Sequence, residues 1–125
     1  MAETIAVIGA STNPEKYGNM AVRAWQQAGW TVYPINPNES EIEGLTAYRT
    51  IRDTPGEVQA ATMYVPPKLG VRIADGIIEK GVAQVYLNPG AESPELREKL
   101  EAAGIEVIEA CSIMAAKALA YQAGK

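Results

Sequence analysis

A short turn of small residues followed by a lysine is the part of this chain best suited to bind a phosphate group. The turn follows the apolar run 5–8, and apolar side chains recur at helical spacing over residues 20–28. A strand, a small-residue turn and a helix together present backbone N–H groups to phosphate oxygens. The candidate residues are Gly9, Ala10, Ser11, Thr12 and, as a source of positive charge, Lys16. The alternative is an ordinary α/β turn that binds nothing, with Lys16 simply exposed to solvent.

The turn departs from the glycine patterns of the common nucleotide-binding loops. The dinucleotide fingerprint requires glycines at its first, third and sixth positions, and the chain has Gly9, Ser11 and Pro14 there. An acidic residue should follow the second strand to bind the ribose hydroxyls, but Asn36 and Pro37 stand in its place. No Gly-Lys-Ser/Thr sequence follows the turn, which excludes a Walker A loop. A nicotinamide-dependent enzyme therefore remains only an alternative interpretation.

Nucleophilic and metal-binding side chains are scarce. The sequence has no His and a single cysteine, Cys111, which excludes Ser-His-Asp triads, Cys-His pairs and an intramolecular disulfide. Cys111 is interpreted as a small buried apolar residue or as a thiol at a helix N-terminus. Three tyrosines near strand ends could stack on adenine or pack at the rim, namely Tyr17, Tyr64 and Tyr86. The acidic residues at 39–43 indicate a solvated loop rather than a metal site.

Composition limits the partners and the compartment. The net charge of −4 and the lack of a basic stripe predict no nucleic-acid partner. There is no basic N-terminal region with an apolar run after it and no run of about 18 apolar residues, which predicts a cytoplasmic protein without a membrane partner. A small-molecule nucleotide is the expected ligand, and the sequence indicates no particular protein partner.

The elements that must position the turn alternate between strands and helices. A length of 125 residues predicts one domain, spanning residues 1–125. The predicted strands are residues 5–8, 31–35, 60–65, 83–87 and 105–108. Helices are predicted before Gly29, before Gly81, between Ser93 and Gly104, and from Cys111 onward. Residues 39–60 are less regular, with a short extended piece at 44–48 and one helical turn at 51–54. This alternation predicts an α/β fold with a five-stranded parallel sheet covered on both faces.

All carboxyl ends of a parallel sheet lie along one edge, and a ligand binds where the strand order reverses. Four of the five predicted strand ends carry Gly or Pro. These four ends are Ile8-Gly9-Ala10-Ser11, Asn36-Pro37, Val65-Pro66-Pro67 and Asn88-Pro89-Gly90. Taken in order, they resemble the strand ends of the CoA-binding domain family, and the resemblance covers nearly the whole chain. The chain is similar to the small stand-alone bacterial members and, more distantly, to the CoA-binding domain of the succinyl-CoA synthetase α subunit.

The resemblance implies a Rossmann-like fold that binds coenzyme A across these turns. We therefore expect a doubly wound domain that binds coenzyme A or an acyl-CoA without catalysis of its own. A regulatory interaction module with a vestigial nucleotide crevice is a further alternative. On this likeness the first turn would surround the diphosphate and Asn36-Pro37 would border the adenosine. The residues that would lie over the diphosphate are Lys16 and Tyr17. The residues that would flank the nucleotide and the pantetheine arm are Val65, Pro66, Pro67, Asn88, Pro89 and Gly90.

The chain departs from the family pattern at two places. Many members carry a basic residue just after the Asn-Pro pair, suited to the ribose 3′-phosphate, where this chain has Asn38 and Glu39. Stand-alone members often have Arg-Cys followed by Glu-His, where this chain has Ala110-Cys111 and Ala115-Ala116. The second departure removes any acid–base partner for Cys111.

Overall fold

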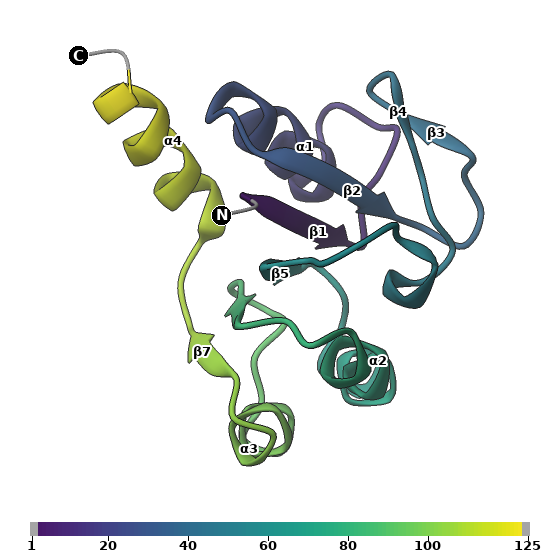
Figure 1. The fold of residues 1–125 in the computed structure, drawn as a ribbon, viewed down its shortest axis with the longest axis vertical. Helices are drawn as coiled ribbons and strands as arrows, with labels where there is room; N and C mark the ends of the chain where they lie inside the picture. The colour runs from purple at the N-terminus through teal and green to yellow at the C-terminus, as the bar shows by residue number, and fades with distance from the viewer. Residues whose placement is uncertain (1–2, 124–125) are drawn as a thin grey trace.

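A five-stranded parallel sheet lies at the centre of the computed structural model, which describes residues 3–123 (Figure 1). The spatial order is β2-β1-β5-β6-β7, and every neighbouring pair is parallel. Residues 1, 2, 124 and 125 of the predicted domain lie outside the described residues. The strands are β1 (Thr4–Ile8), β2 (Thr31–Ile35), β5 (Ala60–Met63), β6 (Gln84–Leu87) and β7 (Glu106–Ile108). All five predicted strands are confirmed: β2 has its predicted bounds, and each of the other four differs from its prediction at one end by one or two residues.

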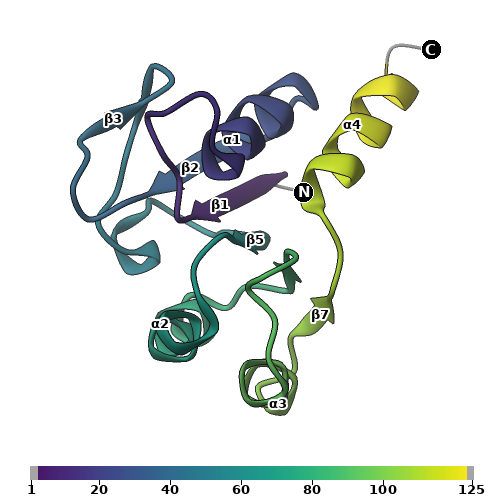
Figure 2. The ribbon, with the colours of Figure 1, turned by 180° about the vertical axis from the view of Figure 1, so that it is seen from behind.

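Four helices cover the two faces of this sheet. They are α1 (Tyr17–Gln27), α2 (Pro67–Lys80), α3 (Pro94–Ala102) and α4 (Ser112–Ala123). The helices α1 and α4 pack together on one face, and α2 and α3 pack together on the other (Figures 1 and 2). The predicted doubly wound α/β fold is therefore confirmed. None of the helices described over residues 3–123 combines the length and the apolar character needed to cross a bilayer.

The central strand β1 shows why an unbroken apolar run suits this position. Ile5 and Val7 belong to the apolar layer under α1 and α4, whereas Ala6 and Ile8 belong to the layer under α2 and α3. All four side chains are at most 1% exposed. Successive side chains of a strand point to opposite faces, so a strand covered on both sides needs apolar residues at every position.

The predicted helix boundaries rest on local chemistry. The Ser93 hydroxyl caps α3 by accepting a hydrogen bond from the Leu96 N–H at 3.1 Å, and Pro94 occupies the first helical position. Helix α2 ends at Lys80, directly before the predicted stop Gly81. Helix α1 ends at Gln27, two residues before Gly29.

The connection between β2 and β5 holds a pair of strands that sequence patterns did not predict as a hairpin, although the second strand falls within the extended piece predicted at 44–48. The strands β3 (Glu41–Ile42) and β4 (Leu45–Thr46) form a short antiparallel hairpin. Its turn passes through Glu43, whose φ of 51° is unusual for a residue with a side chain. After it, the short 3₁₀ helix η1 (Ile51–Asp53) confirms the helical turn predicted over 51–54.

The strand order reverses between β1 and β5. The chain leaves β1 toward β2 on one side and later returns to β5 on the other side. The segments that follow β1 and β5 therefore diverge and leave a crevice at the carboxyl edge. This crevice is where the predicted ligand site should lie.

Candidate functional site

The first two residues of the turn after β1 do not offer the free N–H groups that the sequence suggested. The N–H groups of Gly9 and Ala10 both donate to the Ile35 carbonyl of β2, at 3.2 Å. Their hydrogen bonds thus join the turn to the sheet. Among the described residues, no acceptor exists for the N–H groups of Ser11, Thr12, Tyr17 and Gly18.

These four unused donors come from two neighbouring segments. Ser11 and Thr12 follow β1, while Tyr17 and Gly18 begin α1. Helix α1 approaches the turn so closely that a Cβ at Gly18 would lie 2.2 Å from the Gly9 carbonyl oxygen. The partial positive charge of a helix N-terminus and unused N–H groups together form a site for an anion.

Side chains fix the shape of this turn. The Asn19 amide, which is fully buried, donates to the Ser11 carbonyl at 2.9 Å and to the Glu43 carboxylate at 3.0 Å. Arg23 donates to the Asn19 side-chain oxygen and to the Pro14 carbonyl, both at 2.8 Å. The turn is therefore anchored to α1 and to the β3–β4 hairpin.

The predicted residue Asn36 has a structural contact of its own. Its side-chain N–H donates to the Ala10 carbonyl at 2.8 Å, and its side-chain oxygen accepts from the Asn38 N–H at 2.8 Å. Asn36 therefore joins the turn after β1 to the turn after β2. An acidic side chain at this position has no N–H with which to donate to that carbonyl.

A cavity of about 670 Å³ opens at the carboxyl edge beside the anion site. Ten of the fourteen predicted site residues line it: Gly9, Ala10, Ser11, Lys16, Tyr17, Asn36, Val65, Pro66, Pro89 and Gly90. The lining also includes Tyr64, one of the three tyrosines considered for stacking on adenine, and three residues without a predicted role: Glu15, Gly18 and Ala91.

A second cavity of about 450 Å³ adjoins the first, and the two share Gly9, Asn36 and Val65. Pro37 lines this second cavity. Its floor is largely apolar, with residues such as Ile8, Ile35, Ile51, Leu69 and Ile73. Three arginines also line it, from the segment before β5 and from α2: Arg49, Arg52 and Arg72. Sequence patterns gave no signal for Arg49 and Arg52, because they lie in the segment without a clear periodicity.

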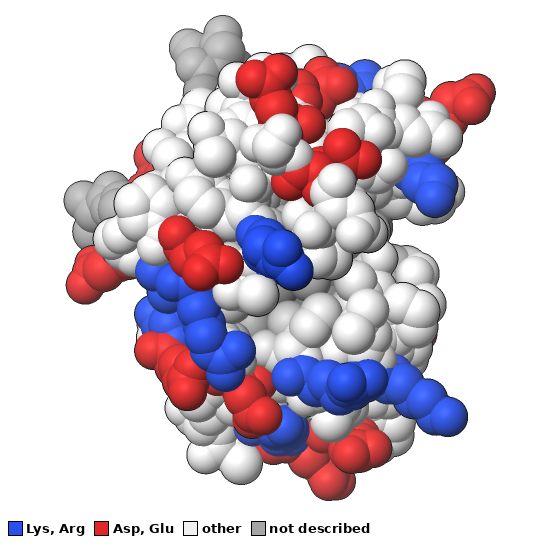
Figure 3. All heavy atoms as spheres, turned by 90° about the vertical axis from the view of Figure 1, so that its right-hand side faces the viewer, with Lys and Arg blue, Asp and Glu red and all other residues white. Residues whose placement is uncertain are grey.

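Basic side chains border the hollowed surface at this edge (Figure 3). The view in Figure 3 looks onto the side toward which β1 and β2 point in Figure 1. Lys16 lines the first cavity and the three arginines line the second. Glu15 adds one carboxylate to the first lining, so the two linings together carry an excess of positive charge although the whole chain carries a net charge of −4.

Three predicted site residues line neither cavity: Thr12, Pro67 and Asn88. Thr12 is exposed beside the anion site, and Pro67 is the first residue of α2. Asn88 is only 2% exposed, and its amide donates to the Thr62 hydroxyl at 2.7 Å and to the Met63 carbonyl at 2.9 Å. Its side-chain oxygen accepts from the Ser112 N–H at 2.8 Å, so Asn88 links β5, β6 and α4.

The hydroxyl groups beneath the cavity extend this network. Ser112 is fully buried, and its hydroxyl oxygen lies 2.7 Å from that of Thr62 and 3.1 Å from that of Tyr64. Burial raises the pKa of Tyr64 above its usual value. Tyr64 therefore lines the cavity as a neutral phenol at neutral pH.

Cys111 is half-buried among the apolar residues under α1 and α4 and lines neither cavity. Tyr86 also packs there, with its ring centroid 6.0 Å from that of Trp25, whereas Tyr17 is 68% exposed at the first cavity. Within residues 3–123, no three Asp, Glu or Cys side chains lie close enough together to hold a metal ion.

Comparison with known proteins agrees with this geometry. The model of a CoA-binding domain matches residues 3–117. The chain is 39% identical over 84 residues to the alpha subunit of an ADP-forming acetate–CoA ligase II from Pyrococcus furiosus, and this match covers 66% of the chain but only 18% of that subunit. It is 25% identical over 118 residues to the uncharacterised protein YneT from Bacillus subtilis, which covers 94% of this chain and 87% of that protein.

Solved structures share the whole architecture. A conserved hypothetical protein from Pyrococcus furiosus superimposes with a TM-score of 0.81 at 38% identity, covering 92% of this chain and 99% of that one. A dinucleotide-forming acetyl-coenzyme A synthetase 1 from Ca. Korarchaeum cryptofilum, in complex with phosphate and ADP, superimposes with a TM-score of 0.77 at 30% identity. That match covers 87% of this chain and 26% of the synthetase.

Proposed function

The chain belongs to the CoA-binding domain family, and from this premise we propose that it binds coenzyme A or an acyl-CoA across the carboxyl edge of its sheet. One observation carries the proposal. Unused N–H groups at the start of α1, together with Lys16, face a cavity that continues into a second, largely apolar one. An anionic group in the middle of an elongated ligand fits this arrangement.

The ligand would lie across both cavities. Its diphosphate would accept hydrogen bonds from the N–H groups of Ser11, Thr12, Tyr17 and Gly18, with Lys16 beside it. The adenosine would occupy the second cavity next to Asn36 and Pro37. The pantetheine arm would run through the first cavity along Val65, Pro66, Pro89 and Gly90, with Pro67 and Asn88 behind these turns.

We propose binding without catalysis by this chain. The sequence has no His to act as a general base near neutral pH, and Cys111 lines neither cavity. A cytoplasmic location stays a prediction from the sequence, as does the expectation of a small-molecule rather than a nucleic-acid partner. The acetate–CoA ligase activity named for the longer relative is not proposed for this chain.

Thermal unfolding with a panel of nucleotides tests the proposal. At about 100 times its dissociation constant, CoA should add about 2.7 kcal/mol to the free energy of unfolding, which raises the melting temperature by several degrees. Acetyl-CoA should act similarly, and NAD should not, because the chain lacks the dinucleotide glycines and the ribose-binding acid. A shift with NAD alone, or equal shifts with NAD and CoA, would favour the nicotinamide enzyme instead. No shift with any nucleotide would favour an interaction module.

Lys16→Ala should lower the affinity for CoA by about 10- to 100-fold, because a charge-assisted hydrogen bond contributes roughly 1.5–3 kcal/mol. The fold should survive, since Lys16 is exposed. Isothermal titration calorimetry measures the change. Lys117→Ala on α4 removes the same charge from a residue outside both cavities and should leave the affinity unchanged. If Lys16→Ala and the unmodified protein bind CoA with equal affinity, Lys16 is a solvent-exposed lysine without a role in binding.

A further inference from the structure

Three arginines from segments that are separate in the sequence line the second cavity. Arg49 and Arg52 come from the segment around η1, and Arg72 comes from the second turn of α2. All three residues are exposed, so their charged ends reach solvent while the cavity floor below them is apolar. An apolar floor with a cationic rim suits a flat ring system that carries a terminal anionic group.

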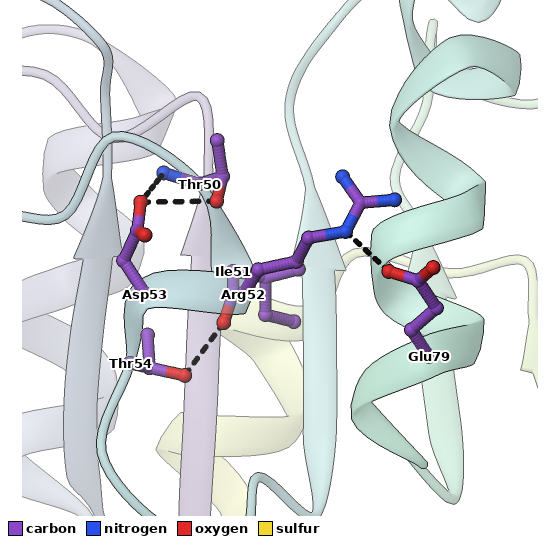
Figure 4. A network of polar contacts seen from close by, with 6 residues as sticks. All are labelled: Thr50, Ile51, Arg52, Asp53, Thr54 and Glu79. Atoms are coloured by element: carbon purple, nitrogen blue, oxygen red, sulfur yellow. Dashed lines mark hydrogen bonds and ion pairs between the residues drawn. The ribbon is translucent and has the colours of Figure 1, made fainter.

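The segment that carries Arg49 and Arg52 is held in shape by local hydrogen bonds (Figure 4). The Asp53 carboxylate accepts from the Thr50 N–H at 3.2 Å and from the Thr50 hydroxyl at 3.0 Å. The Thr54 hydroxyl donates to the Ile51 carbonyl at 2.7 Å. The two arginines therefore project from a constrained turn.

The charge of these arginines is only partly neutralised. Among the described residues, the side chains of Arg49 and Arg72 form no hydrogen bond and no ion pair. Arg52 donates its Nε–H to the Glu79 carboxylate, and its two terminal nitrogens point away from that carboxylate (Figure 4). Asp53 and Asp75 also lie near Arg52.

Arg52 is held close to α2 at a glycine. A Cβ at Gly76 would lie 3.3 Å from Cζ of Arg52, so the absence of a side chain there lets the guanidinium lie against the helix. The contact with Glu79 is made one turn further along the same helix. Arg52 therefore bridges η1 and α2 at the cavity wall.

The rim can be reached by one end of the proposed ligand. The two cavities share Gly9, Asn36 and Val65. A ligand whose diphosphate lies at the start of α1, as in the proposed function, would therefore extend its nucleoside end into the second cavity. The turn after β2 offers no cation there, since Asn38 and Glu39 follow Asn36-Pro37. The only arginines or lysines in the lining of the second cavity are these three.

We propose that Arg49, Arg52 and Arg72 bind the ribose 3′-phosphate of coenzyme A and make the site selective for ligands that carry this group. The inference rests on the proposed function. A phosphate monoester offers three acceptor oxygens and close to two negative charges, which guanidinium groups bind as paired donors. The uncharged pantetheine arm has no group for this rim, so the arginines also set the direction in which the ligand lies.

Calorimetric titration of the full chain with CoA and with 3′-dephospho-CoA tests the assignment. The unmodified protein should bind CoA at least about tenfold more tightly, the smaller effect expected for one charge-assisted contact. The double variant Arg49→Ala/Arg72→Ala should lose this preference while keeping its affinity for 3′-dephospho-CoA within about twofold, because the missing contacts involve only the 3′-phosphate. Arg97→Ala, which removes an arginine of α3 outside both cavities, should keep the full preference.

The outcomes separate the two proposals. Equal affinities for the two ligands in the unmodified protein, or a preference that persists in the double variant, would overturn the arginine assignment and leave CoA binding intact. Failure of both ligands to bind would overturn the proposed function and the assignment together. Arg72→Lys should retain a reduced preference, because lysine keeps the charge without the paired donors. Circular dichroism and melting temperatures establish that each variant is folded.

Discussion

Gly9→Ala should destabilise the protein by about 3–4 kcal/mol, whereas Gly29→Ala should cost only about 1 kcal/mol. Both glycines have nearly the same backbone conformation, with φ of 88° and 85°, so both substitutions carry a similar backbone strain. They differ in what an added Cβ would meet. At Gly9 it would lie 2.6 Å from the Tyr64 carbonyl oxygen, whereas at Gly29 it would meet nothing within 4 Å.

The clash at Gly9 is with backbone, so no side-chain rotation relieves it. The turn or the end of β5 must shift, which should also displace the anion site and abolish CoA binding. Urea denaturation of the two variants measures the difference, with unchanged m-values indicating that only stability has changed. Equal destabilisation by the two substitutions would show that the backbone at Gly9 and Tyr64 can move apart without a cost in stability.

Asn88→Ala should destabilise the protein by about 3 kcal/mol, which lowers the melting temperature by roughly 10 °C. The buried amide of Asn88 satisfies the Ser112 N–H and the Met63 carbonyl, which are backbone groups of two different elements. Without it, each is left buried with one fewer partner, at a cost of about 1–3 kcal/mol for an unsatisfied group. The link between β5, β6 and α4 is lost at the same time.

The exposed residue Asn38 offers a matched control. Its side chain forms no hydrogen bond with the described residues, so Asn38→Ala should change stability by less than about 0.5 kcal/mol. Scanning calorimetry of both variants gives the two melting temperatures. A fall of only one or two degrees for Asn88→Ala would mean that water or a rearranged Ser112 replaces the amide.

Local patterns in the sequence were sufficient for the strands of the central sheet and the helices that cover it. The strand β1 is apolar at every position because both of its faces are covered, and this pattern is visible without any knowledge of its neighbours. The cap at Ser93 and the stop at Gly81 likewise depend only on adjacent residues. Because parallel strands share one carboxyl edge, the sequence order also predicted which turns come together, and ten of the fourteen predicted residues line one cavity.

The sequence missed what depends on contacts between distant segments. It indicated free N–H donors at Gly9 and Ala10, but in the tertiary structure both donate to the Ile35 carbonyl of β2. The unused donors include those at the start of α1 instead. The β3–β4 hairpin was missed because its turn places Glu43 in a conformation that residue type does not favour.

The roles of Asn88 and of the arginines were likewise decided only by the fold. Asn88 was predicted to flank the ligand, yet packing of α4 over the sheet buries its side chain and gives its amide three partners. Arg49 and Arg72 are 23 positions apart and share no pattern. They line one cavity because η1 packs on α2, a contact that only the assembled tertiary structure creates. Local propensity determines the elements and their ends, whereas the charge around a cavity depends on which distant surfaces the chain brings together.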